Sequence, residues 1–345
     1  MSETVKVKHS SQYYAIQKHK IVVIIIACVL FLGVVAWVTP IRKVVTMGVE
    51  RVWIYIDEYY NGQEVETQKP LVEGLRLSIT KARNINQYKT VTKYKSDLYQ
   101  GNLVLVNNQH ACKVLQGDDL ISVEEAKNTS YKLVDKKMML NREMLGQLNR
   151  MMKDFERDTG KHDMILTSGY RTVEEQENVL QEKTQLVGAE DARKWAMLPR
   201  YSEHHTGYAV DVSIYTDQGN YIRYKGQDEY GWINQNSYRY GLIRRYSGEK
   251  KDITGVADEE WHYRYVGVPH AYVITAMNFC FEEYIEYLKQ YRYDTEHLMV
   301  KCDQGAYEIY FVPYEEEETH VPVPIKKEYS ILGNNVDGYI VTVER

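Results

Sequence analysis

The chain is poor in cysteine and nearly neutral, and both features narrow what it can be. Its 345 residues include only four cysteines, and no two of these form a Cys-x-x-Cys pair. Neither a disulfide framework nor a cysteine-ligated zinc site is therefore indicated, although one bridge among Cys112, Cys280 and Cys302 stays open. The formal net charge of −5 argues against a general nucleic-acid binder, which would carry a strongly basic face.

Only one long apolar run without charge is present, at residues 21–38. Its 18 residues just reach the length that spans a bilayer. A cleaved signal peptide is the alternative, but the run lacks a small-x-small cleavage site and is long for one. We expect a retained anchor at 21–38 behind a cytoplasmic tail at 1–20, with the rest of the chain outside the membrane. This orientation is favoured by the lysines that precede the run, namely Lys6, Lys8, Lys18 and Lys20.

Chemistry-bearing side chains are concentrated at residues 202–211, which read SEHHTGYAVD. The apolar alternation that begins at Val210 predicts a strand, with Asp211 on its other face among small side chains. Gly207 allows the sharp turn that would bring one of the two imidazoles toward Asp211. A carboxylate among small neighbours leaves room for a ligand to lie on it.

A second cluster at 258–262, DEEWH, adds another imidazole directly after acidic residues. Two histidines and one aspartate form a suitable ligand set for a catalytic zinc ion whose fourth position holds water. A neighbouring glutamate could take the proton of that water. The alternative is a structural or surface cluster, because histidine and aspartate often lie close together by chance.

A third motif, SGYR at 168–171, completes a recognisable pattern. It is followed by S-x-H-x-x-G-x-A-x-D at 202–211 and by E-x-W-H-Y-R-Y-V-G at 259–267. In order and spacing the chain resembles the D-alanyl-D-alanine carboxypeptidases of the VanY type, within the LAS zinc peptidases, from about residue 101 to about residue 288. The resemblance implies an α+β fold, a small antiparallel-sheet zinc peptidase domain of the hedgehog and D-Ala-D-Ala peptidase type.

The resemblance also implies how the site is composed. One zinc ion would be held by His204, Asp211 and His262. The family's general base lies three residues before the last of these ligands, which selects Glu259. The adjacent imidazole of His205 falls at a variable position, and we expect it to point elsewhere.

Further roles follow from the same resemblance. In the family the arginine that corresponds to Arg171 points into the zinc site, where its fixed charge and forked donors suit an oxyanion. Ser168, Gln176 and Ser202 would contact the substrate. For Ser202 a second role is open, that of holding His204 in place.

The substrate that the resemblance implies is a peptidoglycan stem peptide ending in D-Ala-D-Ala, which loses its last D-Ala outside the membrane of a Gram-positive bacterium. The same residues would also serve an L,D-carboxypeptidase, a D,D-dipeptidase or an endopeptidase that cuts cross-links. Outside enzymes, a wall-binding membrane protein that no longer uses its metal site remains an alternative.

The organisation we expect is a single transmembrane helix, a stalk or spacer at 39–99, the zinc peptidase domain at 100–292 and a small β-rich appendage at 293–345. Helical spacing predicts a helix over 141–158, whose methionines belong to the core, and a closing helical stretch at 269–291. Apolar alternation or short apolar runs predict strands at 75–79, 102–106, 164–167, 306–312 and 339–343.

Overall fold

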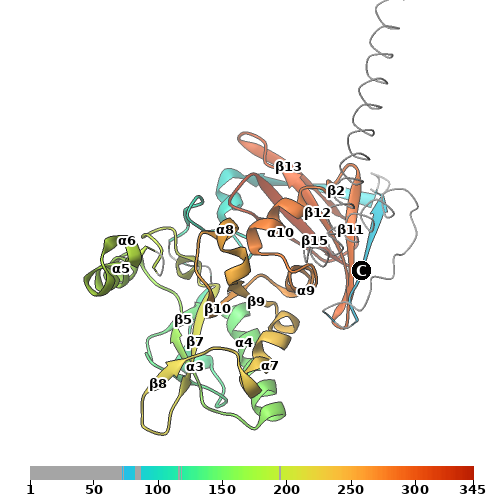
Figure 1. Ribbon diagram of the computed structural model, residues 1–345. Coiled ribbons are helices and arrows are strands. Elements are labelled where there is room, and N and C mark those ends of the chain that lie inside the picture. The colour runs from blue at the N-terminus through green and yellow to red at the C-terminus, as the bar shows by residue number, and fades with distance from the viewer. Residues whose placement is uncertain (1–71, 73, 82–86, 116, 118, 194–195) are drawn as a thin grey trace, which may run out of the picture. The chain divides into compact units, whose positions relative to one another are not determined.

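The computed structural model describes residues 72, 74–81, 87–115, 117, 119–193 and 196–345, which build two main sheets and the helices packed on them (Figure 1). The expected tail at 1–20 and anchor at 21–38 lie outside the described residues. Among the helices of the described residues, none has the length and apolar character needed to cross a bilayer.

The first sheet carries the clustered histidines and acids. Its strand order is β4-β6-β7-β10-β9. Strand β8 pairs with residues 213–215 of β7, beyond the part of β7 that pairs with β10. All neighbours are antiparallel except the short β4, which runs parallel to β6. The strands expected at 164–167 and from 210 onward are thereby confirmed. The bounds are β4 Lys132–Leu133, β6 Met164–Ser168, β7 Ala209–Tyr215, β8 Tyr221–Arg223, β9 Leu242–Tyr246 and β10 Glu259–Tyr265.

Helix α4 (Arg142–Thr159) covers one face of this sheet. It begins at Asn141, whose side chain accepts hydrogen bonds from the first free amides, and ends at Gly160 in the left-handed conformation. Its apolar side packs on Leu166, Val210, Val212 and Tyr263, and the methionines are core residues as predicted. The buried α4 side chains are Met144, Leu145, Leu148, Met151, Met152 and Phe155. The opposite face of the sheet is left for polar side chains.

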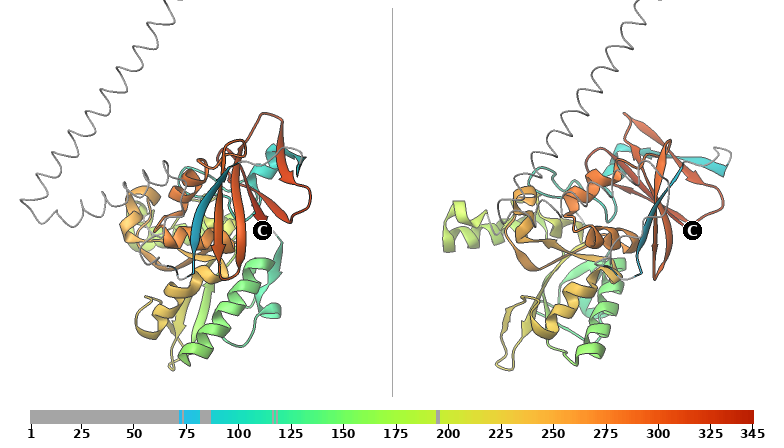
Figure 2. Two further views of the ribbon diagram at one scale, coloured as in Figure 1. Left: turned by 90° about the vertical axis from the view of Figure 1, so that its right-hand side faces the viewer. Right: turned by 45° about the vertical axis from the view of Figure 1, so that its right-hand side comes forward.

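The second sheet joins both ends of the described chain. Its order is β1-β11-β12-β15-β14, and every neighbouring pair is antiparallel. In Figure 2 the blue strand β1 lies beside the red strands of the C-terminal region. The strands expected at 75–79, 306–312 and 339–343 are confirmed. The bounds are β1 Arg76–Lys81, β11 Glu296–Cys302, β12 Gly305–Pro313, β14 Tyr329–Gly333 and β15 Gly338–Glu344.

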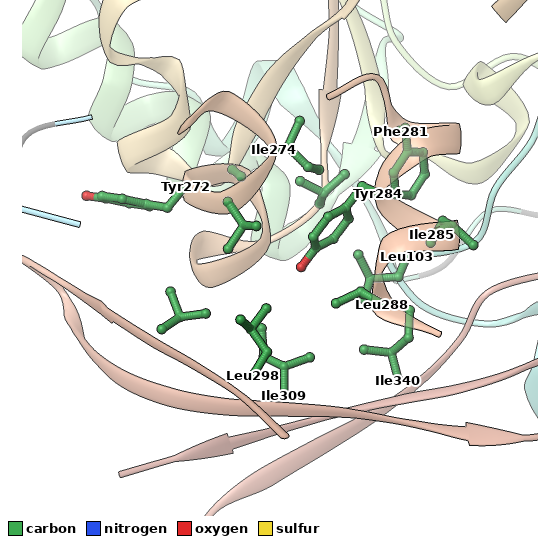
Figure 3. Close-up of a cluster of buried hydrophobic side chains, with 14 of the residues drawn as sticks. Leu103, Tyr272, Ile274, Phe281, Tyr284, Ile285, Leu288, Leu298, Ile309 and Ile340 are labelled. Carbon is green, nitrogen blue, oxygen red and sulfur yellow. The ribbon is translucent and has the colours of Figure 1, made fainter. Parts of the chain in front are cut away.

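Both faces of the second sheet are covered. Helices α9 (Val268–Ala276) and α10 (Phe281–Leu288) pack on Leu298, Ile309 and Ile340 (Figure 3). The other face packs on the paired strands β2 (Tyr88–Tyr94) and β13 (Glu318–Pro324). The domain limits at 99/100 and 292/293 stay a prediction. The structure adds that strands from the expected spacer and the expected appendage share one core with α9 and α10.

One strand prediction is wrong. Residues 102–106 are buried and apolar but form no strand. Several of their backbone groups are bonded by distant partners: Arg264 donates to the carbonyls of Asn102 and Val104, and the Leu105 amide donates to the carbonyl of Asn334. Buried backbone groups need hydrogen-bond partners, but these partners need not belong to a neighbouring strand.

The remaining elements are helix α5, of 15 residues, and several shorter helices and strands. The closing stretch at 269–291 is helical as predicted, but it is divided into α9 and α10. Cys112, Cys280 and Cys302 are buried free thiols, so no bridge joins these three. The other bounds are β3 Leu120–Ser122, β5 Met139–Asn141, α3 Val123–Ala126, α5 Val173–Val187, α6 Ala189–Ala192, α7 Gly231–Asn236 and α8 Lys251–Thr254.

Candidate active site

Strand pairing and one tight turn bring three of the predicted site residues together. In the register of β7 and β10, Asp211 lies opposite His262. His204 comes from the single turn η3 (Glu203–Thr206), which enters β7 through Gly207. Gly207 has a φ of 79°, and a Cβ there would lie 2.5 Å from the side chain of Leu120, so only glycine fits this turn.

The three side chains form a compact group of donor atoms. Ligand atoms of His204, Asp211 and His262 all lie within 4.8 Å of one another. The two carboxylate oxygens of Asp211 lie 3.3 Å from Nε2 of His204 and 2.9 Å from Nδ1 of His262. No other group of this kind occurs in the described ranges of the chain. The structure therefore brings together the residues that were predicted as ligands.

The second nitrogen of each imidazole faces a hydrogen-bond acceptor. Nδ1 of His204 lies 2.6 Å from the carbonyl oxygen of Gly169, and Nε2 of His262 lies 3.2 Å from a carboxylate oxygen of Glu203. Protons on these nitrogens leave Nε2 of His204 and Nδ1 of His262 facing Asp211. Metal-binding histidines commonly have such an arrangement, and a set of two imidazoles and one carboxylate fits a zinc ion.

The pKa values of the two histidines shift in opposite directions. Burial, and next the charge of Arg171, lower the pKa of His204 to about 4, so its imidazole is neutral at pH 7. Burial also acts to lower the pKa of His262, but hydrogen bonds to Asp211 and Glu203 outweigh it and raise the pKa to about 9. Burial alone would raise the pKa of Asp211, whereas the two histidines hold it well below its usual value.

Glu259 opens strand β10 and is 9% exposed. Burial raises the pKa of its carboxyl to about 7, with Asp211 acting in the same direction and with His262 and Arg171 opposing. A carboxyl group that titrates near neutrality can both accept and return a proton at the pH of the cell, as a general base and acid must.

Arg171 lies between β6 and α5 and points at the ligand group. Its Nη2 lies 3.0 Å from Oδ2 of Asp211 and 3.1 Å from Nε2 of His204. Its other nitrogens donate to Ser168 Oγ at 2.8 Å and to Gln176 Oε1 at 2.9 Å. Ser168 and Gln176 therefore orient Arg171, and their contact with substrate stays a prediction.

Ser202 and His205 fix the backbone around the site. The hydroxyl of Ser202 is buried and accepts from the amide of His204 at 3.4 Å, which supports the role of holding His204. His205 points away from the ligand group, as expected. Its Nε2 accepts from the amide of Arg200 at 3.0 Å, so Nδ1 donates to the carbonyl of Arg171 at 2.8 Å.

The sequence reasoning missed Glu203. Its side chain is fully buried and lies 2.8 Å from Nε of Arg245 and 3.2 Å from Nη1 of Arg264, besides the contact with His262. The available signal was two arginines, at 245 and 264, within otherwise apolar and aromatic strands. Long cations at inward positions of a strand indicate a buried partner of opposite charge.

Comparisons with known proteins agree with this geometry. The family model of VanY, D-alanyl-D-alanine carboxypeptidase, matches residues 137–268. A D-alanyl-D-alanine carboxypeptidase of Enterococcus faecium is 34% identical over 260 residues, which cover 74% of this chain and 79% of that protein. The bifunctional D-Ala-D-Ala dipeptidase and D-Ala-D-Ala carboxypeptidase VanXYC of Enterococcus gallinarum is 34% identical over 160 residues, 45% of this chain and 82% of that one.

A solved structure extends the likeness beyond the motifs. The crystal structure of the vancomycin resistance D,D-dipeptidase VanXYg, in complex with a D-Ala-D-Ala phosphinate analog, superposes with a TM-score of 0.67 at 29% identity. The match covers 75% of this chain and 99% of that chain. The chain belongs to the VanY family of D-alanyl-D-alanine carboxypeptidases, enzymes of the M15 peptidase group.

Proposed function

We propose that this protein uses one zinc ion to remove the C-terminal D-Ala from peptidoglycan stem peptides or precursors that end in D-Ala-D-Ala. The observation that carries the proposal is the convergence of His204, Asp211 and His262 on one point, with Glu259 and Arg171 beside them. In this reading the first three residues hold the metal.

The residues of the chain divide the chemistry among themselves. When bound, zinc supplies a Lewis acid that polarises the scissile carbonyl and makes a water molecule more acidic. Glu259 accepts a proton from the attacking water and returns it to the nitrogen of the leaving D-Ala as the C–N bond breaks. Arg171 donates to the carbonyl oxygen as negative charge develops there. Ser168 and Gln176 keep the guanidinium in position.

A second substrate is favoured by the relatives. VanXYC is named as both a dipeptidase and a carboxypeptidase, and VanXYg is named as a D,D-dipeptidase. Cleavage of free D-Ala-D-Ala is therefore the alternative function of the same residues. An L,D-carboxypeptidase or endopeptidase activity would use the same ligands and base.

We further propose that the catalytic part acts outside the cell membrane. Lysines before the apolar run at 21–38 support this orientation. A reporter fused after residue 345 tests it: activity of a fusion to an enzyme that folds only outside the cytoplasm would support the proposal. Activity confined to a reporter that requires the cytoplasm would contradict it.

A product assay tests the catalytic proposal. The protein is incubated with zinc and a stem pentapeptide, the corresponding tetrapeptide or free D-Ala-D-Ala, and the products are identified by mass. We expect D-Ala and tetrapeptide from the pentapeptide, and no release with His204→Ala. Release from the tetrapeptide alone would indicate an L,D-carboxypeptidase, and release from the dipeptide alone a dipeptidase. Pentapeptide hydrolysis that survives His204→Ala would contradict the zinc site.

A further inference from the structure

Glu203 is a buried carboxylate that the proposed mechanism does not use. Its side chain is 0% exposed, and its neighbours are Arg245, Arg264 and His262. A charge taken wholly out of water is costly unless cations or strong donors surround it. The chain provides two fully buried arginines for this one acid, and the acid in turn contacts one of the expected metal ligands.

The contact specifies how His262 can bind a metal. An ionised carboxylate only accepts hydrogen bonds, so Nε2 of His262, at 3.2 Å from Glu203, carries a proton. Nδ1 faces Asp211 at 2.9 Å within the ligand group, so its proton is the one that a bound metal would displace. Exchange of the two nitrogens would turn the lone pair toward Glu203 and away from the ligand group.

Glu203 itself is held by the two arginines. Arg245 Nε binds Glu203 Oε1 at 2.8 Å, while its terminal nitrogens bind both oxygens of Glu282 on α10 at 2.9 and 2.6 Å. Arg264 is fixed by the carbonyls of Asn102 and Val104. A continuous set of charged contacts therefore runs from helix α10 through Arg245 and Glu203 to His262.

We propose that Glu203 is a positioning residue that holds His262 in the Nε2-protonated tautomer, with Nδ1 as its ligand atom. Through Arg245, Glu282 of helix α10 fixes Glu203 and so contributes to the affinity for the metal. This inference rests on the proposed zinc site, but it concerns residues that bind neither metal nor substrate. Removal of partners of this kind typically weakens metal affinity 10–100-fold.

Zinc affinity is the measurement, made on the full chain by competition with a chromogenic chelator. Glu203→Gln keeps the shape but can offer only one oxygen, so either His262 or the arginines lose their acceptor. We expect its zinc dissociation constant to rise about 10–100-fold. Glu282→Gln, which acts through Arg245, should raise it by a smaller factor, at the lower end of that range or about 10-fold.

A matched control lies one residue further along α10. Glu283 pairs with Lys250 at 2.8 Å and binds the Cys280 amide, and neither contact leads toward the site. The side-chain oxygen of Glu283→Gln still accepts from that amide, and we expect unchanged zinc affinity. Equal affinities for Glu282→Gln and Glu283→Gln would overturn the role of α10.

Nitrogen-15 spectra of the histidine rings provide a readout that a general loss of stability would not change. In the zinc-loaded wild type we expect the His262 proton on Nε2, shifted downfield by its charged acceptor. In Glu203→Gln that shift should shrink. A proton on Nδ1 of His262 in the loaded wild type would overturn the inference. If Glu203→Gln does not fold, the spectrum of the wild type and the Glu282 and Glu283 pair decide the question.

The proposed zinc site and this inference fail in different ways. If His204→Ala binds zinc as tightly as the wild type does, the proposed site is wrong, and the inference falls with it. If His204→Ala loses zinc but Glu203→Gln binds it as the wild type does, only the role of Glu203 is wrong.

Discussion

The two main sheets of this protein are buried in different ways. Most of the second sheet lies between apolar surfaces, with α9 and α10 on one face and β2 with β13 on the other, and its buried acid Glu308 pairs with His297. The first sheet has an apolar face under α4, whereas its other face carries buried charges: Asp211, His262 and Arg264 with their partners. Both sheets therefore have a large apolar core, and the first sheet in addition holds the expected ligand group.

Histidines in the two sheets show the same contrast. His297 in β11 is completely buried, and its nitrogens face Glu308 at 2.6 Å and the carbonyl of Tyr293 at 2.8 Å. Both of its ring nitrogens thus face acceptors that lie outside any group of possible ligands. His204 has one nitrogen on a carbonyl and the other directed at Asp211 and Arg171. Burial and hydrogen-bond acceptors do not by themselves mark a ligand; what distinguishes His204 and His262 is that both converge on the same carboxylate, that of Asp211.

Glu259→Gln should have the largest effect, because it removes a reactive side chain of the first sheet without removing an expected ligand. The substitution removes the proton acceptor and keeps the size of the side chain. We expect D-Ala release to fall roughly 10²–10⁴-fold, the usual contribution of general acid–base catalysis. Zinc affinity and the free energy of unfolding should stay near wild type, because Glu259 is not among the expected ligands. Equal turnover of variant and wild type would exclude Glu259 as the base.

Arg171→Met is expected to have the next largest effect. Loss of an oxyanion donor typically lowers kcat by about 10²–10³-fold. Steady-state kinetics on the pentapeptide should place most of this loss in kcat rather than in KM, because the interaction strengthens only in the transition state. Arg142→Met is the matched control, since the side chain of Arg142 is exposed and pairs with Asp119 at the surface. A loss confined to KM would assign Arg171 to substrate binding instead.

Ile309→Ala tests the second sheet. Ile309 is completely buried against α9 and α10, and truncation of such a side chain usually costs about 2–5 kcal/mol of unfolding free energy. Urea unfolding measures this cost, and zinc affinity in the folded protein should not change. Ile222→Ala, at a position that is 54% exposed on β8, is the control with little expected effect. A large loss of zinc affinity in Ile309→Ala would show that the two sheets are not separate in function.

The sequence predicted the parts that depend on local patterns. Helix α4 differs by one residue at each end from the expected 141–158, because its apolar spacing is a local signal. The ligand group was identified through the family resemblance, and in the structure a turn at Gly207 and one strand pairing bring its residues together. Arg171, which follows β6, was placed by the resemblance and lies in the ligand group.

Features that depend on distant partners were not predicted. Residues 102–106 have the composition of a strand, but Arg264 and Asn334 form hydrogen bonds with several of their backbone groups. Strand β1 pairs with β11, from the far end of the chain, and no local pattern names that partner. In the sequence nothing distinguishes Glu203 from other polar residues near the motif, because its partner Arg245 contacts it only in the folded protein. Local patterns thus located the site, and long-range packing determined what supports it.

The smallest expected effect concerns a buried histidine between α9 and the second sheet. His270 on α9 is buried, with Nδ1 at 2.7 Å from the hydroxyl of Tyr284 and Nε2 at 3.1 Å from the hydroxyl of Thr342. Burial lowers its pKa from 6.5 to about 3. In the unfolded chain the same group takes up a proton below about pH 6.5. The unfolded state is therefore favoured as the pH falls from 6.5 toward 3, and rising pH restores stability.

His270→Gln isolates this contribution. Between pH 7 and pH 5 the wild type should lose about 2 kcal/mol of unfolding free energy through His270 alone, at roughly 1.4 kcal/mol per pH unit below 6.5. The variant lacks this term but keeps every other titrating group, so its loss over the same interval should be smaller by that amount. Urea unfolding of both proteins at the two pH values, with zinc saturating, gives the difference. Equal losses would mean that His270 is protonated inside the fold, and that the interior beneath the second sheet accepts charge as the first sheet does.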